Sequence, residues 1–126
     1  MDYWHAIEKI MLDGPFKVQV SYRYSDEDLS HLYPDGTPDQ IREQYEMINK
    51  HESFLFDVRI RYLYANEVIL SETSRYSCHY NEFPENAILA GLDGEIELMM
   101  IEGKEKALEK AKNLLDNLQN DFGEGS

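Results

Sequence analysis

The sequence predicts an α+β fold in which an antiparallel sheet packs against helices that cover one of its faces. Between residues 54 and 80, apolar residues alternate with polar ones, stop at a short polar break, and then alternate again. Alternation at period two predicts half-buried strands, and two such runs around a tight break predict a hairpin. Over residues 89–118, apolar and small residues recur every three or four positions, which predicts a helical C-terminal third. The expected order of elements is therefore α-β-α-β-β-α.

The first element, residues 2–12, is predicted to be a short amphipathic helix. Trp4, Ile7 and Met11 are spaced so that they would share one helical face. Residues 13–15, Asp-Gly-Pro, would end this helix, because glycine suits a helix C-terminus and proline cannot continue the helical turn.

A predicted strand and a predicted helix flank an acidic loop. Residues 16–24 alternate strictly between apolar and polar side chains, as expected of a strand. Residues 25–37 are polar and form the loop. The next helix is expected to begin after Thr37, which forms a capping-box pattern with Gln40, and to continue to about Lys50.

The hairpin and the C-terminal third each contain one ambiguous segment. In the second strand of the hairpin, Glu72 and Ser74 interrupt the apolar alternation, so either a bulge lies near them or that part of the strand runs beyond the core. Residues 95–101 alternate like a strand, which would raise the strand count from three to four. We prefer a helix because nine residues fit one helical stripe: Leu89, Leu92, Ile96, Met100, Gly103, Ala107, Ala111, Leu114 and Leu118. Residues 1–122 are expected to form a single domain, and residues 123–126 a frayed tail.

The charge balance favours a basic partner. The chain has 25 Asp and Glu against 12 Lys and Arg, a net charge of −13. Such a field repels phosphate, so direct binding to nucleic acid or to an anionic membrane is disfavoured, whereas association with a basic protein is accelerated. The single cysteine excludes an internal disulfide, and we see no leader at the N-terminus and no apolar run near the ~20 residues of a membrane span. We therefore expect a cytoplasmic protein.

Catalytic, metal and cofactor motifs are not evident, and the chain is not expected to be an enzyme. Cys78 and His79 are adjacent in a predicted strand, so their side chains would point to opposite faces and could not form a dyad. The four histidines lack the paired spacing of metal ligands. We expect neither a metal nor a cofactor.

The acidic loop is the first candidate binding surface. Its carboxylates would attract a positively charged surface, and Tyr33 is a rigid, amphipathic anchor. We hypothesise a small acidic inhibitor that occupies the basic groove of a nuclease or other nucleic-acid-binding protein. Phage-encoded blockers of restriction or CRISPR nucleases and immunity or antitoxin proteins are the classes it resembles in charge and size alone. The residues proposed for this contact are Asp26, Glu27, Asp28, Tyr33 and Asp35.

The arginines of the strands form a second candidate surface. Arg23, Arg59, Arg61 and Arg75 are four of the five arginines, and alternation predicts that they point to the same face. One interpretation is that they balance nearby carboxylates on a solvated face. The other is a patch that binds anions or acidic peptides, since the planar guanidinium suits carboxylates and phosphates.

Two other classes of function stay open. A pocket between the sheet and the helices could bind a small molecule, and Tyr22, Tyr62, Glu72 and Tyr76 are the residues that would have to converge there. Alternatively, the chain could be an adaptor subunit, with a homodimer formed through an edge strand.

Overall fold

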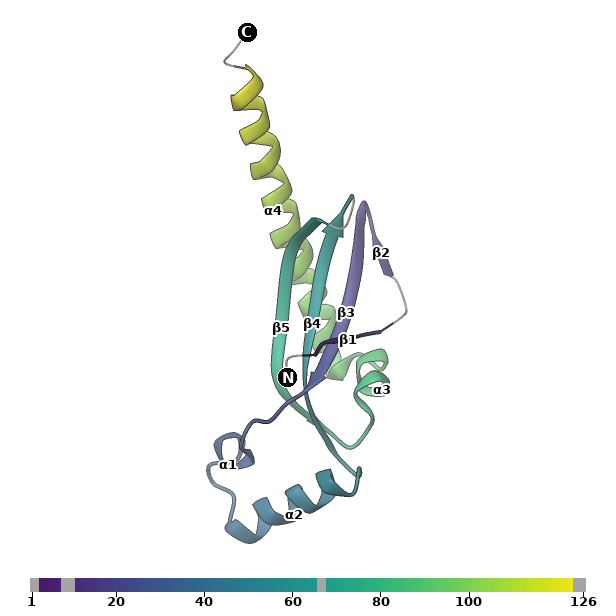
Figure 1. The fold of residues 1–126 in the computed structure, drawn as a ribbon, viewed down its shortest axis with the longest axis vertical. Helices are drawn as coiled ribbons and strands as arrows, with labels where there is room; N and C mark the ends of the chain where they lie inside the picture. Colours follow the sequence, from purple (N-terminus) through teal and green to yellow (C-terminus); the bar gives the residue numbers. More distant parts are fainter. Residues whose placement is uncertain (1–2, 8–10, 66–67, 124–126) are drawn as a thin grey trace.

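The computed structural model describes residues 3–7, 11–65 and 68–123, and it is an α+β fold with an antiparallel five-stranded sheet and a long C-terminal helix (Figure 1). In chain order the elements are β1 (His5–Ala6), β2 (Met11–Asp13), β3 (Phe16–Tyr24), α1 (Leu29–Leu32), α2 (Pro38–Asn49), β4 (Phe54–Tyr64), β5 (Val68–Tyr80), α3 (Pro84–Leu89), the 3-10 turn η1 (Leu92–Gly94) and α4 (Glu95–Gly123).

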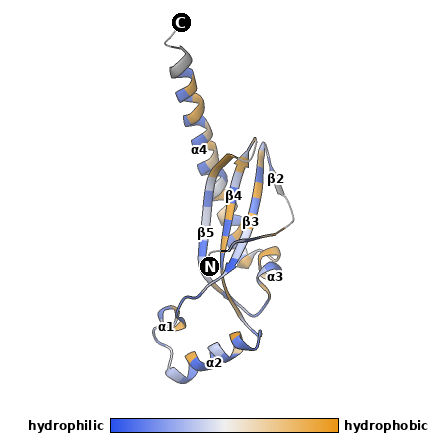
Figure 2. Ribbon diagram, in the orientation of Figure 1, coloured by the Kyte–Doolittle hydropathy of each residue, from blue (hydrophilic) through white to orange (hydrophobic). Residues whose placement is uncertain are grey.

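The three long strands, β3, β4 and β5, confirm the strand and hairpin that the alternation predicts. The sheet order is β1-β3-β4-β5, with β2 also paired to β3, and all of these pairs are antiparallel. One face of the three long strands is apolar and buried, with Val18, Ile60 and Tyr62 each at most 1% exposed. The alternation is visible as mixed blue and orange along the strands in Figure 2.

The predicted N-terminal helix is wrong for the residues that the structure describes, and residues 2 and 8–10 of that segment lie outside them. His5 and Ala6 instead pair with β3, as do Met11 to Asp13. The glycine expected to end a helix is the first residue of a two-residue hairpin turn, where Gly14 has a φ of 61° and Asp13 pairs with Phe16. Pairing with the long strand β3 therefore overrides a weak helical pattern.

The pairing of β5 with β4 has two register shifts, and neither lies at Glu72–Ser74, where one of the two interpretations of the sequence places a bulge. The pairing moves from Tyr62 with Ser71 to Leu63 with Ile69, which leaves Leu70 as an extra residue. It shifts again between Phe56 and Val58, where two residues of β5, including Ser77 with a φ of 57°, lie opposite one residue of β4. Each extra residue exchanges the faces to which the following side chains point.

Helix α4 packs closely on the sheet because small residues line the contact. Ala107 is fully buried, and a Cβ on Gly103 would lie only 2.9 Å from Cε1 of Tyr62. The Ser71 hydroxyl donates to the Gly103 carbonyl at 2.7 Å, and the Tyr62 hydroxyl donates to the Met100 carbonyl at 3.0 Å. The helical C-terminal third is thus confirmed.

The helices do not all cover one face of the sheet, which corrects the predicted arrangement. The core cluster includes residues of α3, η1 and α4, whereas α2 has no buried residue and lies beyond one end of the sheet (Figure 1). Residues 95–101 are helical, so the extra strands are the two short N-terminal ones. Gly123 of the predicted tail ends α4, and residues 124–126 lie outside the described residues. A single domain over residues 1–122 stays a prediction.

Candidate functional site

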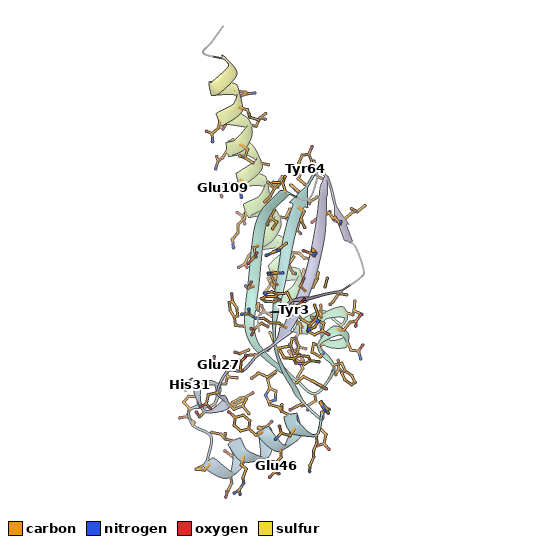
Figure 3. All side chains as sticks on the ribbon, viewed as in Figure 1. Tyr3, Glu27, His31, Glu46, Tyr64 and Glu109 are labelled. Atoms are coloured by element: carbon orange, nitrogen blue, oxygen red, sulfur yellow. The ribbon has the colours of Figure 1, made fainter. Side chains whose placement is uncertain are left out.

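Residues 25–53, which we call the arm, connect β3 to β4 and stand apart from the sheet at the end away from the C-terminus (Figure 1). The arm has two Lys or Arg residues against eight carboxylates, a net charge of −6. Glu27 and Glu46 are among the arm side chains labelled in Figure 3. All eight carboxylate residues are exposed: Asp26, Glu27, Asp28, Asp35, Asp39, Glu43, Glu46 and Glu52.

The base of the arm is held together around Asp28 and Tyr45. Asp28 is the N-cap of α1, and its Oδ1 accepts from the Ser30 amide at 2.9 Å and from the Ser30 hydroxyl at 2.8 Å. The Tyr45 hydroxyl of α2 donates to the same oxygen at 3.1 Å and accepts from the Leu29 amide at 3.1 Å. Leu29 is completely buried beneath these bonds, so the two helices of the arm form one unit.

The carboxylate of Asp28 is kept ionised by these donors. The Ser30 amide contributes most to lowering the pKa of Asp28 below its usual value, followed by the Ser30 hydroxyl and the Tyr45 hydroxyl. Next to Asp28, the Glu27 carboxylate lies 3.3 Å from Nδ1 of His31, which is four residues further along the chain. The negative charge at the start of α1 is thus a fixed feature of the arm.

The arm is joined to the end of β5 through Tyr33 and His79. The Tyr33 hydroxyl lies 2.9 Å from Nδ1 of His79, and Nε2 of His79 lies 3.2 Å from Oγ of Ser53. Burial lowers the pKa of His79, so the ring favours its neutral form. Ser53 is 0% exposed, and the chain of bonds through His79 links the arm to the start of β4.

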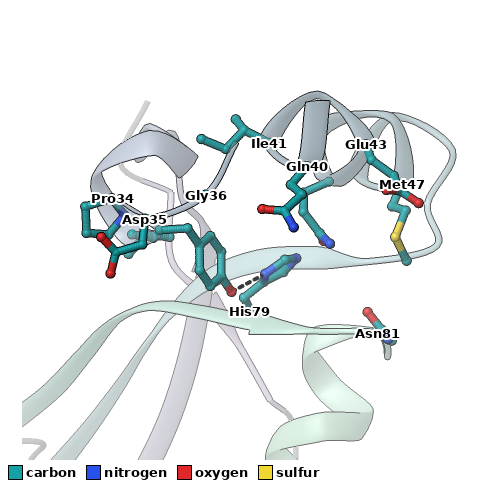
Figure 4. Close-up of a pocket in the computed structure, with 12 residues that line it drawn as sticks. Pro34, Asp35, Gly36, Gln40, Ile41, Glu43, Met47, His79 and Asn81 are labelled. Atoms are coloured by element: carbon teal, nitrogen blue, oxygen red, sulfur yellow. Dashed lines mark hydrogen bonds between the residues drawn. The ribbon is translucent and has the colours of Figure 1, made fainter. Parts of the chain in front are cut away.

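Between the arm and the end of β5 lies a groove of about 790 Å³, shown in Figure 4. Asp35 and Glu43 supply two carboxylates, and Gln40, Tyr33 and His79 supply neutral polar groups. Lys and Arg are absent from the twelve described residues that line it. The groove therefore offers acceptors and negative charge with no competing cation.

The residues that the sequence marks for partner binding all lie on the arm, but they fall into two groups. Asp26, Glu27 and Asp28 line a hollow of about 560 Å³ at the base of the arm, whereas Tyr33 and Asp35 line the groove. Sequence reasoning missed the groove contributions of Gln40, Glu43 and His79. The polar, uninterrupted face of α2 was the available signal for the first two, but the contact of His79 with the arm depends on tertiary structure alone.

The four arginines do not share one face. Arg23, Arg59 and Arg61 pair with residues of the neighbouring strands on the open face, as predicted. Arg75 lies opposite Val58 and bonds to Glu95 at 3.1 Å and Glu102 at 3.0 Å on α4, so the prediction is wrong for this residue.

Most of these arginines have a carboxylate partner. Arg23 bonds to Asp57 at 2.9 Å and Arg61 to Glu72 at 2.8 Å. The guanidinium groups of Arg23 and Arg59 also stack on the Trp4 ring, at 4.5 and 4.3 Å from its centroid. This pairing favours charge compensation over an anion-binding patch.

The residues named for a small-molecule pocket do not converge. Tyr62 is completely buried against α4, whereas Glu72 lies on the open face and Tyr76 is 65% exposed. Cys78 packs against the core, where burial raises the pKa of its thiol to about 11.

Within residues 3–7, 11–65 and 68–123, no three His, Cys, Asp or Glu side chains gather as metal ligands would. Over the same ranges, each helix is too short or too polar to cross a bilayer.

Comparisons with protein-family models, with curated proteins and with solved structures find no match to this chain.

Proposed function

We propose that this chain works by binding a basic protein surface through its arm, and that the partner is a nuclease or another nucleic-acid-binding protein whose basic groove the arm occupies. The observation that carries the proposal is the separation of the arm from the sheet with all eight of its carboxylates exposed. A phage-encoded anti-defence protein and an immunity or antitoxin protein are the biological classes that this activity fits.

The electrostatics of the arm suit association with a nucleic-acid-binding surface. Proteins that bind nucleic acid present clustered Lys and Arg to phosphates, and exposed carboxylates engage the same cations. The arm carries −6 of the chain's −13 charge within residues 25–53. Charge concentrated at one projecting end speeds encounter with a basic partner, and salt weakens this effect because the Debye length is only ~10 Å at 0.1 M.

The groove supplies a place for a cationic side chain of the partner. Asp35 and Glu43 lie on it, and Tyr33, 43% exposed, presents a ring at its edge. A partner Lys or Arg could pair with a carboxylate there while its aliphatic stem packs on the tyrosine. Because His79 favours its neutral form, it adds no repulsion at neutral pH.

The alternative function, a small-molecule site between the sheet and the helices, has less support because Tyr62 and Glu72 lie on opposite faces. An adaptor could also bind its partner through the arm. It would differ from the proposed inhibitor only in leaving the partner's nucleic-acid groove unoccupied.

The proposal is tested with three baits in affinity capture from a lysate of the source organism at low and high salt. The first is the wild-type chain, and the second carries Asp26→Lys, Glu27→Lys and Glu43→Lys on the arm. The third, which we call the α4 bait, carries Glu97→Lys and Glu105→Lys on α4 and Glu85→Lys on α3, all exposed and away from the arm, which changes the net charge equally. Asp28 is left intact because it caps α1.

We expect a nucleic-acid-binding protein to be captured by the wild-type and α4 baits at low salt, and to be lost with the arm variant and at high salt. Adding the partner's nucleic acid should release the bait. Equal capture by the arm and α4 variants, or capture unaffected by salt, would contradict the proposal.

A further inference from the structure

The distal half of α4 carries an apolar stripe that this chain does not cover. Leu108, Leu114, Leu115 and Leu118 are 50%, 46%, 56% and 53% exposed, and Ala111 lies among them half-buried. Their spacing of three and four residues places them on one side of the helix. Figure 2 shows these apolar positions continuing along α4 past the end of the sheet. Adjacent exposed leucines of this kind mark an interaction surface.

The tip of the β4–β5 hairpin extends this apolar surface. The Lys110 ammonium donates to the Ile69 carbonyl at 3.3 Å, so the tip lies beside α4 between the exposed Leu108 and Leu114. Tyr64, Val68 and Ile69 at this tip are 50%, 51% and 39% exposed. Tyr64 is labelled there in Figure 3, at the end of the sheet opposite the arm.

The charge of this surface indicates which partner covers it. From Leu108 to Leu118, Lys110 and Lys112 balance Glu109 and Asp116, so this segment has no net charge in a chain of −13. A second copy of the chain is repelled least at this segment, and its own mixed Lys and Glu residues can pair across the contact. A basic partner of the kind expected at the arm gains no electrostatic attraction here.

We propose that the distal half of α4 is the interface of a homodimer in which two copies of this helix pack antiparallel about a two-fold axis. Each helix extends beyond its own sheet, so the leucines of the two copies can meet, and the end of each helix reaches the hairpin tip of the other. Antiparallel packing opposes the two helix dipoles favourably. It also sets the two acidic arms at opposite ends of the assembly, where their mutual repulsion is smallest.

Sedimentation equilibrium of three proteins tests this interface: the wild-type chain, Leu115→Glu and Leu98→Glu. Leu98 is 52% exposed on α4 but lies nearer its N-terminus and off the apolar stripe, so it is a matched control for the added charge. We expect the wild-type chain and Leu98→Glu to reach twice the monomer mass of 14.8 kDa. Because a two-fold axis places each substitution in the contact twice, Leu115→Glu should weaken dimerisation at least tenfold.

Circular dichroism of the three proteins establishes that the variants keep their helix content, which exposed substitutions should leave unchanged. A wild-type chain that stays monomeric at high concentration overturns the proposal and leaves the stripe for a different protein. A dimer that survives Leu115→Glu, or that is lost equally with Leu98→Glu, overturns it as well. None of these outcomes depends on whether the arm binds a basic partner.

Discussion

The Tyr33 hydroxyl and Nδ1 of His79, from residues 46 positions apart in the sequence, lie 2.9 Å from each other. This bond joins the arm to the end of β5 and forms one wall of the groove (Figure 4). On its other side, His79 contacts the buried Ser53 at the root of β4. The position of the acidic surface relative to the sheet is thus set partly by these polar contacts, because α2 buries no side chain of its own.

Replacing Tyr33 with phenylalanine should loosen the arm without unfolding the sheet. The variant loses one partly exposed hydrogen bond, which corresponds to about 1 kcal/mol and about a fivefold loss of protection. Hydrogen exchange of the α1 and α2 amides measures this change. Tyr64→Phe, at the opposite end of the molecule, should leave their exchange unaltered. An equal loss of protection in Tyr33→Phe and Tyr64→Phe would show that the bond to His79 does not hold the arm.

The stability of the protein should fall as the pH drops below about 6.5 because of His79. Burial lowers the pKa of His79 from its usual value of 6.5, so the unfolded chain takes up this proton before the folded chain does. The contribution of His79 to the free energy of unfolding is complete above pH 6.5. It is lost progressively as the pH falls toward the lower pKa that His79 has in the folded protein. Urea unfolding between pH 7.5 and about 5 measures it.

The His79→Gln variant is the control for this pH dependence. Glutamine can bond to both Tyr33 and Ser53 but does not titrate. Its unfolding free energy should vary less with pH over the same interval. A slope identical to that of the wild-type chain would assign the effect to other groups.

The long strands could be predicted from the sequence because every second residue of them is buried. Val18, Val20, Ile60 and Tyr62 all face the core, so the period of two is a direct record of burial. The C-terminal helix was predictable for a similar reason. Its stripe through Gly103, however, continues past the sheet, and the sequence alone gives no sign of where the contact ends.

The faces of β5 could not be predicted because bulges depend on the partner strand. The extra residue near Ser77 places Arg75 and His79 on opposite faces, although their even spacing predicts a shared one. The helix predicted for the N-terminal segment is wrong for a different reason. Trp4 and Ile7 have helical spacing, yet Trp4 stacks on the arginines of the open face while Ile7 joins the core on the other.

Within the candidate site, the acidic arm residues were predictable and the groove was not. Asp26, Glu27 and Asp35 are evident as a cluster of charge in a polar loop. That Asp35 lines a groove together with His79 depends on how the arm folds back on β5, whereas Asp26 and Glu27 line a separate hollow. The path of the arm is set by contacts such as the one between Tyr45 and Asp28, which no local pattern encodes.

The bulge at Ser77 should depend on Asp57. Asp57 is 5% exposed, and its carboxylate accepts from Nε of Arg23 and from the Ser77 amide, both at 2.9 Å. Asp57→Ala removes both acceptors, and we expect a loss of about 2–3 kcal/mol in unfolding free energy. Asp57→Asn keeps an acceptor for the amide and should cost less. Urea denaturation measures the free energy of unfolding of both variants. Equal losses in Asp57→Ala and Asp57→Asn would show that the bond from the Ser77 amide does not stabilise the bulge.

Replacing Gly103 with alanine should destabilise the fold even though alanine favours helices. Alanine gains about 1 kcal/mol in helix propensity over glycine, but overpacking a core costs about 1–3 kcal/mol. The added methyl group would lie 2.9 Å from Cε1 of Tyr62, and this ring cannot retreat because its hydroxyl is held by Asp13 and the Met100 carbonyl. We therefore expect a net loss of unfolding free energy.

Two further comparisons separate this clash from a general effect of substitution in α4. Asn113→Ala, at an exposed position of the same helix, should raise stability by about 0.5 kcal/mol. In a Tyr62→Leu background, where the ring is absent, Gly103→Ala should cost less than in the wild-type chain, and thermal denaturation of the four proteins of this cycle measures the coupling. If Gly103→Ala cost the same in both backgrounds, the close approach of α4 to Tyr62 would not be the reason that glycine occupies this position.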